Sequence, residues 1–302
     1  MNKKSKNEYN HYIINTNNFS NEINTIEIIK NLKLIYKQKK YFPCTEYINV
    51  RPKAIKMLLQ YNNIYHYSKK VFYLSILYLD IIFQSLRTSV LLNDKYEIYI
   101  INIIILAGKF YEDDIKSISF ERFINYNNNK CNLNVDDIGL NEITCLKMLN
   151  YKLNYYSVFD ILTLLIKDYL NITSIDNKDY YNKIYTFPFN ILDNIILSNI
   201  TINYSPIDIA FSLLYKTHMN FQLNNKYFNE FNKKYYFINS DYKECLNNIN
   251  NILNIQNKIY FLDFNIEHKQ IKNNREKNEE NKKNVDINKI YDFILNITQK
   301  NK

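Results

Sequence analysis

Glycine and proline are unusually scarce in this chain. Its 302 residues include two glycines and four prolines. A β-sandwich or β-barrel needs many turns, and those turns depend on these two residues. Isoleucine and tyrosine are abundant and favour strands, but so few turn residues cannot connect the strands of such a fold. We therefore expect an all-α protein.

The same scarcity limits the chemistry that the chain can perform. Gly108 and Gly139 stand alone, so a P-loop, a GxGxxG turn and a GxSxG elbow are excluded. The four histidines show neither HxH nor HxxxH spacing, and we expect His218 to be a capping or surface residue at a helix end. The four cysteines share no CxxC spacing, so we expect neither zinc nor disulfides. We predict a protein that is not an enzyme, without catalytic residues, metal or cofactor.

The charge and the apolar runs bear on partners and location. The net charge of +9 is spread over local runs at Lys3–Lys6, Lys37–Lys40 and Lys269–Lys283. Solvated faces and tails explain such runs, so we do not expect a nucleic-acid partner. The run Ile98–Ala107 is too short to span a bilayer, which takes about 20 residues. We expect no membrane partner and, because no signal peptide is visible, a nuclear and/or cytoplasmic location.

Apolar periodicity predicts helices in the first half of the chain. Residues 1–24 are polar and are expected to form a disordered tail. Thr25–Gln38 has apolar residues at steps of three, which predicts an amphipathic helix. A loop containing Pro43 and Pro52 is expected next, with Pro52 near a helix start. Five helical segments follow, over residues 53–66, 69–84, 93–112, 115–126 and 137–151. The second and third are apolar nearly all round and should be central.

A second cluster of helices is predicted over residues 157–266. Its first two helices are SVFDILTLLIKDYL and FPFNILDNIILSNI. The third should begin at Ser205, since this serine can cap a helix with Pro206 at the first position and Asp208 three residues after the cap. Asp241–Gln256 is a further helix. A charged linker over 267–286 and a C-terminal helix within 287–302 complete the expected organisation.

Two stretches place a possible ion pair beside apolar side chains. In ILAGKFYEDD, Leu106, Lys109 and Phe110 share one helical face. Gly108 lies beside that face, although a glycine inside a helix lowers stability by about 1 kcal/mol relative to alanine. Either another backbone approaches closely at this position, or the glycine is simply tolerated. In NEITCLKMLNYKL, Glu142 heads one face that continues through Leu146, Leu149 and Leu153. A carboxylate there would be costly to bury without a cation, and Lys109 is the candidate.

These residues resemble the cyclin box. The family's usual form reads L-A-(S/A/C)-K-(F/Y)-E-(E/D), followed by E-x-x-x-L-x-x-L-x-aromatic, which is similar to LAGKFYED and to Glu142, Leu146, Leu149 and Tyr151. Arg51 and Asp80 stand at the separation of the family's arginine and aspartate, and TINYSPIDIAFSLLY resembles a helix of its second repeat. The resemblance implies two tandem cyclin-fold domains of five helices each, within 25–156 and 157–266, with flanking N- and C-terminal helices.

The resemblance further implies a regulatory subunit that activates a cyclin-dependent protein kinase. In the family, the lysine and glutamate pair with each other, and the surrounding apolar side chains pack on the kinase's C-helix. The kinase-binding residues would be Leu106, Lys109, Phe110, Glu142, Leu146, Tyr151 and Leu153. The two boxes look most like the transcriptional cyclins of the cyclin H type, which partner a CDK-activating kinase and an assembly factor, whereas Asp80 fits the cell-cycle type.

Two other functions are compatible with such a helical chain. One is an adaptor that binds DNA or a promoter complex, as general transcription factors of the TFIIB type do with the same repeats. Those proteins usually carry an N-terminal zinc ribbon, and no cysteine precedes Cys44. The other is a helical scaffold that has no kinase partner.

Overall fold

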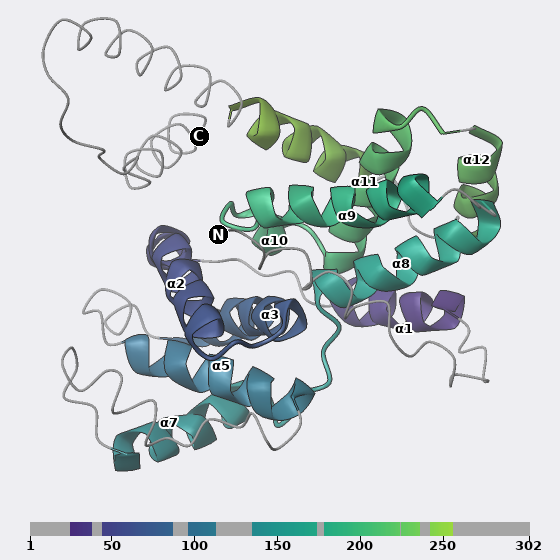
Figure 1. The fold of residues 1–302 in the computed structure, drawn as a ribbon. Helices are drawn as coiled ribbons and strands as arrows, with labels where there is room; N and C mark the ends of the chain where they lie inside the picture. Colours follow the sequence, from purple (N-terminus) through teal and green to yellow (C-terminus); the bar gives the residue numbers. More distant parts are fainter. Residues whose placement is uncertain are drawn as a thin grey trace, which may run out of the picture.

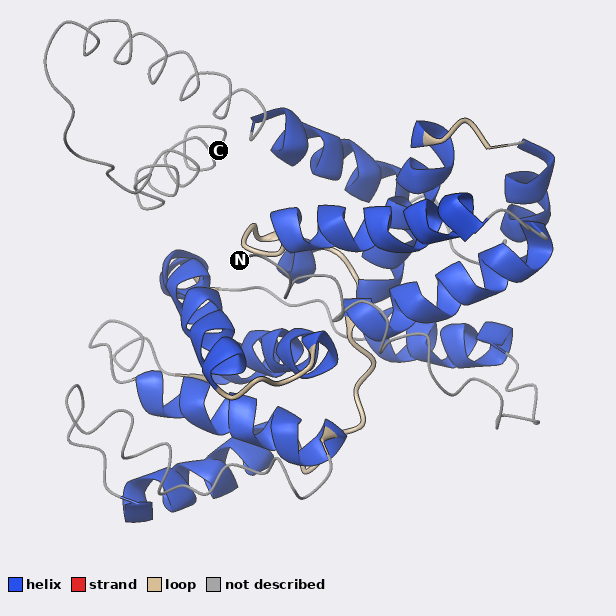
Figure 2. Ribbon diagram, in the orientation of Figure 1, coloured by secondary structure: helices blue, strands red, loops and turns tan. Residues whose placement is uncertain are grey.

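The fold is helical throughout the residues that can be described. The computed structural model describes residues 25–37, 44–86, 96–112, 135–173, 178–223, 225–235 and 242–255. Within these ranges there are helices and turns but no strand (Figure 2), which confirms the all-α prediction. The predicted N-terminal tail, the helix at 115–126, the charged linker and the C-terminal helix lie outside the described residues.

The helices form two groups that follow one another along the chain (Figure 1). The first bundle contains α2 (Thr45–Ile64), α3 (Lys69–Ser85), α5 (Glu97–Tyr111) and α7 (Val135–Met148). The second bundle contains α8 (Val158–Thr173), α9 (Lys178–Ile195), the short α10 (Ile200–Asn203), α11 (Pro206–Asn220), α12 (Asn225–Lys234) and a last helix over residues 242–255.

Each bundle is built around one largely buried helix. In the first, α5 packs against α2, α3 and α7, and every residue from Ile100 to Gly108 is buried. In the second, α11 packs against α8 and α9. A helix that is apolar on all sides must be surrounded by others, so the position of α5 follows from its sequence. This confirms the prediction that α3 and α5 are central.

The first helix, α1 (Thr25–Lys37), packs on the second bundle although the first bundle follows it in the chain. It contacts α8 and α11, and its buried stripe includes Ile29 and Leu32. The hydroxyl of Tyr36 donates a hydrogen bond to the backbone carbonyl of Tyr156, at 2.6 Å. This helix was predicted correctly from its apolar spacing, and its packing ties the two ends of the fold together.

A buried ion pair joins the two bundles. Arg51 of α2 is fully buried, and its Nε lies 2.7 Å from Oδ1 of Asp80 on α3. The same guanidinium donates hydrogen bonds to two carbonyls that follow the buried end of α9, those of Ile196 at 3.2 Å and Ser198 at 2.7 Å. Arg51 therefore connects the first bundle to the turn between α9 and α10.

The carboxylate of Asp80 is equally well supplied with hydrogen bonds. The hydroxyl of Thr201 donates to its Oδ2 at 3.0 Å, and the hydroxyl of Tyr47 donates to Oδ1. Burial alone would lower the pKa of the Arg51 guanidinium, but the charge of Asp80, the interaction with Tyr47 and the hydrogen bonds to both together outweigh burial and raise this pKa. A buried charge is tolerated when it is paired and fully hydrogen-bonded, and this network meets both conditions.

Two helix starts differ from the prediction. Pro52 was expected near a helix start, but α2 begins at Thr45 and Pro52 lies inside it. A proline inside a helix removes one backbone hydrogen bond, and here Tyr47 and Arg51, one turn apart, both bind Asp80 and hold that turn in place. Likewise α9 begins at Lys178 rather than near Phe187, with Pro188 inside it.

Helix α11 of the second bundle begins as predicted, and the short α10 precedes it. Ser205 is its N-cap, Pro206 occupies the first helical position, and the Ser205 hydroxyl accepts a hydrogen bond from the backbone N–H of Asp208. His218, near the other end of this helix, is buried rather than at the surface. Its Nδ1 lies 2.8 Å from the hydroxyl of Tyr169 on α8, so the ring is part of the packing between α8 and α11.

Candidate functional site

The predicted ion pair is present in the structure. Lys109 lies in the last turn of α5 and Glu142 lies on α7, and Nζ of Lys109 is 2.6 Å from Oε1 of Glu142. The lysine side chain is 42% exposed and the glutamate side chain 17% exposed. An ion pair this open to water contributes about 0–1 kcal/mol to stability. The pair is therefore accessible to a partner and is not needed to hold the fold together.

Gly108 brings a tyrosine close to the backbone of α5. A Cβ atom at this position would lie 2.6 Å from Cζ and 2.7 Å from the hydroxyl oxygen of Tyr67. The expected approach of another backbone was wrong, because a side-chain ring occupies the space. A larger residue would force the buried Tyr67 to move, so the glycine has a packing role directly beneath Lys109.

Large apolar side chains are exposed on the helices that carry the ion pair and just after α7. Phe110 and Tyr151, both predicted from the sequence, are exposed. Leu140 and Ile143 on α7 were missed, although they are 65% and 50% exposed. Both lie on the side of α7 opposite the residues that it buries. Several exposed large apolar side chains on neighbouring elements are typical of a surface that binds another protein.

A turn explains where α7 stops. The helix ends at Met148, before the predicted end at residue 151, and Asn150 adopts a left-handed conformation with φ of 54°. The N–H of Tyr151 donates to the carbonyl of Leu146 at 2.8 Å, and that of Asn150 to the carbonyl of Lys147 at 2.9 Å. This pair of bonds is a Schellman motif, in which asparagine can replace glycine. Tyr151 is thereby turned out of the helix and into solvent.

The other predicted kinase-binding residues lie deeper in the structure. Leu106 is only 2% exposed, so it belongs to the core, and its assignment to the binding surface is corrected here. Leu146 and Leu153 are half-buried and pack against the core. Leu153 lies beyond the end of α7, so the predicted single helical face from Glu142 to Leu153 does not exist. Because α5 is apolar on all sides, the sequence could not indicate which of its sides faces solvent.

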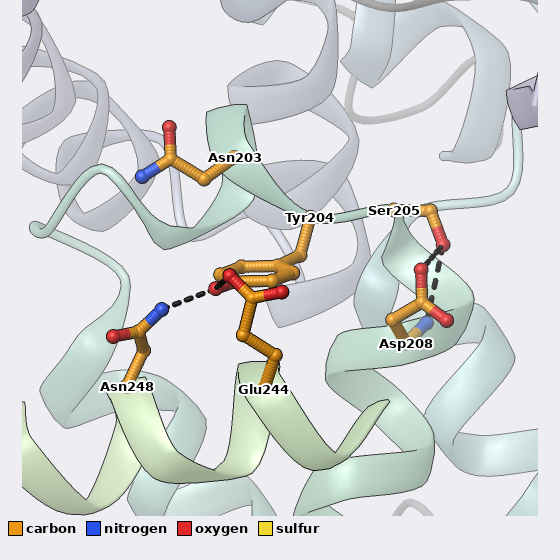
Figure 3. A pocket seen from close by; sticks show the side chains of 6 residues that line it. All are labelled: Asn203, Tyr204, Ser205, Asp208, Glu244 and Asn248. Carbon is orange, nitrogen blue, oxygen red and sulfur yellow. Dashed lines mark hydrogen bonds between the residues drawn. The ribbon is translucent and has the colours of Figure 1, made fainter. Parts of the chain in front are cut away.

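A polar pocket lies in the second bundle, between the segment leading into α11 and the helix over residues 242–255 (Figure 3). The hydroxyl of Tyr204 donates to Oε1 of Glu244 at 3.0 Å and accepts a hydrogen bond from the amide of Asn248. These bonds attach the last described helix to the start of α11, and we assign the pocket a structural role. Its volume is about 420 Å³, and it is lined by Asn203, Tyr204, Ser205, Asp208, Glu244 and Asn248.

Comparison with known proteins bears on the first bundle. Residues 20–154 match the family model of the cyclin N-terminal domain. This match supports a member of the cyclin family. It includes Arg51, Asp80, Lys109, Glu142 and Tyr151, the residues on which the cyclin resemblance depends. It ends just before the second bundle. No curated protein matches the chain.

Two further observations concern the described part of the cyclin-like chain. None of its helices has both the length and the apolar character needed to cross a bilayer. Across the same described ranges, histidine, cysteine and carboxylate side chains form no group of three that could hold a metal ion.

Proposed function

We propose that this protein binds and activates a cyclin-dependent protein kinase by positioning the kinase's C-helix. The observation that carries the proposal is the exposed pair of Lys109 and Glu142, with Phe110 exposed next to Lys109 and with Leu140 and Ile143 exposed on α7. An apolar helix can pack on such side chains, and an ammonium beside them can bind the carbonyl oxygens at the end of that helix.

The activation would be a shift between two states of the kinase. A surface that binds only the inward position of the C-helix favours this position by the difference in affinity. The inward helix completes the kinase's own lysine–glutamate pair, which phosphoryl transfer requires. The proposed activator supplies no catalytic group.

The second bundle fits a second cyclin box, which would give two boxes in tandem. Its central helix begins with Ser205 and Pro206, as in the family's second repeat, and α1 packs across this bundle. We propose a subunit of the cyclin H type, which would act in the nucleus and/or cytoplasm within a CDK-activating or transcriptional kinase complex that can include an assembly factor.

Affinity purification of the tagged chain from its own cells tests this proposal. We expect a protein kinase in nearly equal amount, with higher activity in the complex than alone. Retention on DNA that weakens steeply with salt, without a kinase, would instead support the adaptor that binds DNA or a promoter complex. Recovery of neither a kinase nor DNA would favour the helical scaffold without a kinase partner and would contradict the proposal.

A further inference from the structure

The end of α5 that carries Lys109 contacts the beginnings of two other helices. Oε1 of Glu112, the residue after α5, accepts a hydrogen bond from the backbone N–H of Ser68 at 3.0 Å. The hydroxyl of Tyr111 donates to Oδ2 of Asp160 at 3.2 Å. Ser68 caps α3 in the first bundle, and Asp160 lies in the first turn of α8 in the second. One end of α5 is thus attached to both bundles.

Glu112 completes a cap that α3 cannot complete itself. In a capping box, a carboxylate or amide three residues after the cap binds the N–H of the cap residue. In α3 that position holds Val71, whose N–H is bound by the Ser68 hydroxyl at 3.5 Å. Glu112 provides the missing acceptor from another helix, which fixes the end of α5 against α3.

Asp160 is held in place by its own helix before Tyr111 binds it. Its Oδ2 accepts hydrogen bonds from the backbone N–H of Ser157 at 2.9 Å and from the Ser157 hydroxyl at 2.7 Å. The Asp160 N–H donates back to that hydroxyl, which completes a capping box for α8. The acceptor of Tyr111 is therefore a nearly buried carboxylate whose position the second bundle determines.

A cation covers the contact between Tyr111 and Asp160. Nζ of Lys70 lies 3.9 Å from the centre of the Tyr111 ring and 3.9 Å from Oδ1 of Asp160. Burial, and then the nearby charge of Asp160, raise the pKa of Tyr111, so its hydroxyl keeps the proton that it donates. The contact joins α3, α5 and α8 within one small cluster.

We propose that Tyr111 is a positioning residue, through which the second bundle sets the direction of the last turn of α5. Lys109 lies two residues before Tyr111, and the Phe110 and Tyr111 rings are 4.9 Å apart, so this turn carries two of the surface groups assigned to kinase binding. The inference rests on the proposed function, because it concerns the kinase-binding surface of the first bundle. It gives the second bundle a role at that surface, although the second bundle lies outside the match to the cyclin N-terminal domain.

Hydrogen exchange in the free chain tests the placement without any partner. We expect Tyr111→Phe to speed exchange of the amides in residues 106–112 by about threefold to tenfold, the effect of losing one typical hydrogen bond. Amides at the start of α5 should be unchanged. Tyr181→Phe, the same change at an exposed tyrosine of α9, is the control and should change neither region. Unchanged exchange at 106–112 in Tyr111→Phe would overturn the inference.

Kinase affinity then separates positioning from a general structural role. Tyr111→Phe should weaken binding about threefold to tenfold in the wild-type background and have almost no effect in a Lys109→Ala background, because Tyr111 acts through the placement of Lys109. Equal losses in both backgrounds would contradict this mechanism. A wild-type chain that binds no kinase would refute the proposed function, while the exchange experiment would still decide whether Tyr111 holds the end of α5.

Discussion

The two ion pairs of the first bundle have similar lengths and opposite surroundings. Arg51 and Asp80 lie 2.7 Å apart with side chains that are 0% and 7% exposed, whereas Lys109 and Glu142 lie 2.6 Å apart at the surface. The buried pair binds carbonyls of the second bundle, while Lys109 of the open pair remains 42% exposed next to the exposed side chain of Phe110.

The comparison shows that distance alone does not indicate what an ion pair does. Removing one member of a buried pair leaves an uncompensated charge in the interior, which is strongly destabilising. Water replaces the missing partner at an open pair, so the fold loses little. We therefore assign Arg51 and Asp80 to stability, and the openness of the other pair is consistent with the recognition role proposed for Lys109 and Glu142.

The largest expected effect is on stability at the buried pair. Asp80→Asn should lower the free energy of unfolding by about 3–5 kcal/mol, because the Arg51 charge stays buried without its partner. Glu142→Gln, the matched change at the open pair, should lower it by no more than about 1 kcal/mol. Urea denaturation followed by circular dichroism measures both. Similar losses in the two variants would contradict the distinction between the pairs.

The exposed apolar side chains of α7, the helix that carries Glu142, should affect binding without affecting the fold. Leu140→Ser and Ile143→Ser together should weaken kinase binding at least tenfold, since exposed apolar side chains near the centre of an interface can each contribute more than about 1 kcal/mol. The melting temperature should hardly change because both side chains are already exposed. Leu34→Ser on α1, 63% exposed and remote from the pair in sequence, is the control. Equal effects of the control and of the double variant on binding would show that Leu140 and Ile143 are not part of the kinase-binding surface.

The packing of Gly108 against Tyr67 should be sensitive to substitution, although the neighbouring ion pair contributes little to stability. Gly108→Ala should destabilise the chain by about 1–2 kcal/mol, because overpacking against Tyr67 exceeds the gain in helix propensity. In a Tyr67→Leu background the same change should be neutral or stabilising, because the ring is gone. Thermal unfolding of the four chains measures this cycle. A stabilising Gly108→Ala in the wild-type background would show that Tyr67 moves aside at no cost.

The smallest effect concerns a buried group that can gain a charge. Burial lowers the pKa of His218, and a hydrogen bond with Asn225 only partly opposes this. Between the folded pKa and the unfolded value of about 6.5, the unfolded chain binds more protons, so stability should fall as the pH decreases below about 7. Urea denaturation at several pH values measures this slope. His218→Gln should flatten it, and an identical slope in that variant would assign the effect to other groups.

The sequence predicted the parts of the structure that depend on local pattern. The scarcity of glycine and proline indicated helices, the all-round apolar segments indicated the central helices, and Ser205 with Pro206 marked a helix start that the structure confirms. The pairing of Lys109 with Glu142 was also predicted, from the cost of burying a lone carboxylate and from the resemblance to the cyclin box.

What the sequence could not supply depends on three-dimensional contacts. Pro52 was interpreted as lying near a helix start and a second helix was expected to begin at Phe187, but in the structure Pro52 and Pro188 both lie inside longer helices. Leu106 was wrongly assigned to the surface and Leu140 was missed, because leucine is compatible with both core and surface positions. Arg51 also binds backbone carbonyls about 145 residues further along the chain. Every residue has a backbone carbonyl, so the sequence does not indicate which ones Arg51 binds.

A charge swap at the open pair tests the central claim most directly. Lys109→Glu, Glu142→Lys and the double variant should be compared for activation of the bound kinase and for the free energy of unfolding. We predict that activation is lost in all three, because in the double variant the ion pair can re-form but the ammonium is on the wrong helix, while stability stays within about 1 kcal/mol of wild type. Recovery of activation in the double variant would show that the pair only supports the fold, and would contradict its role in recognition.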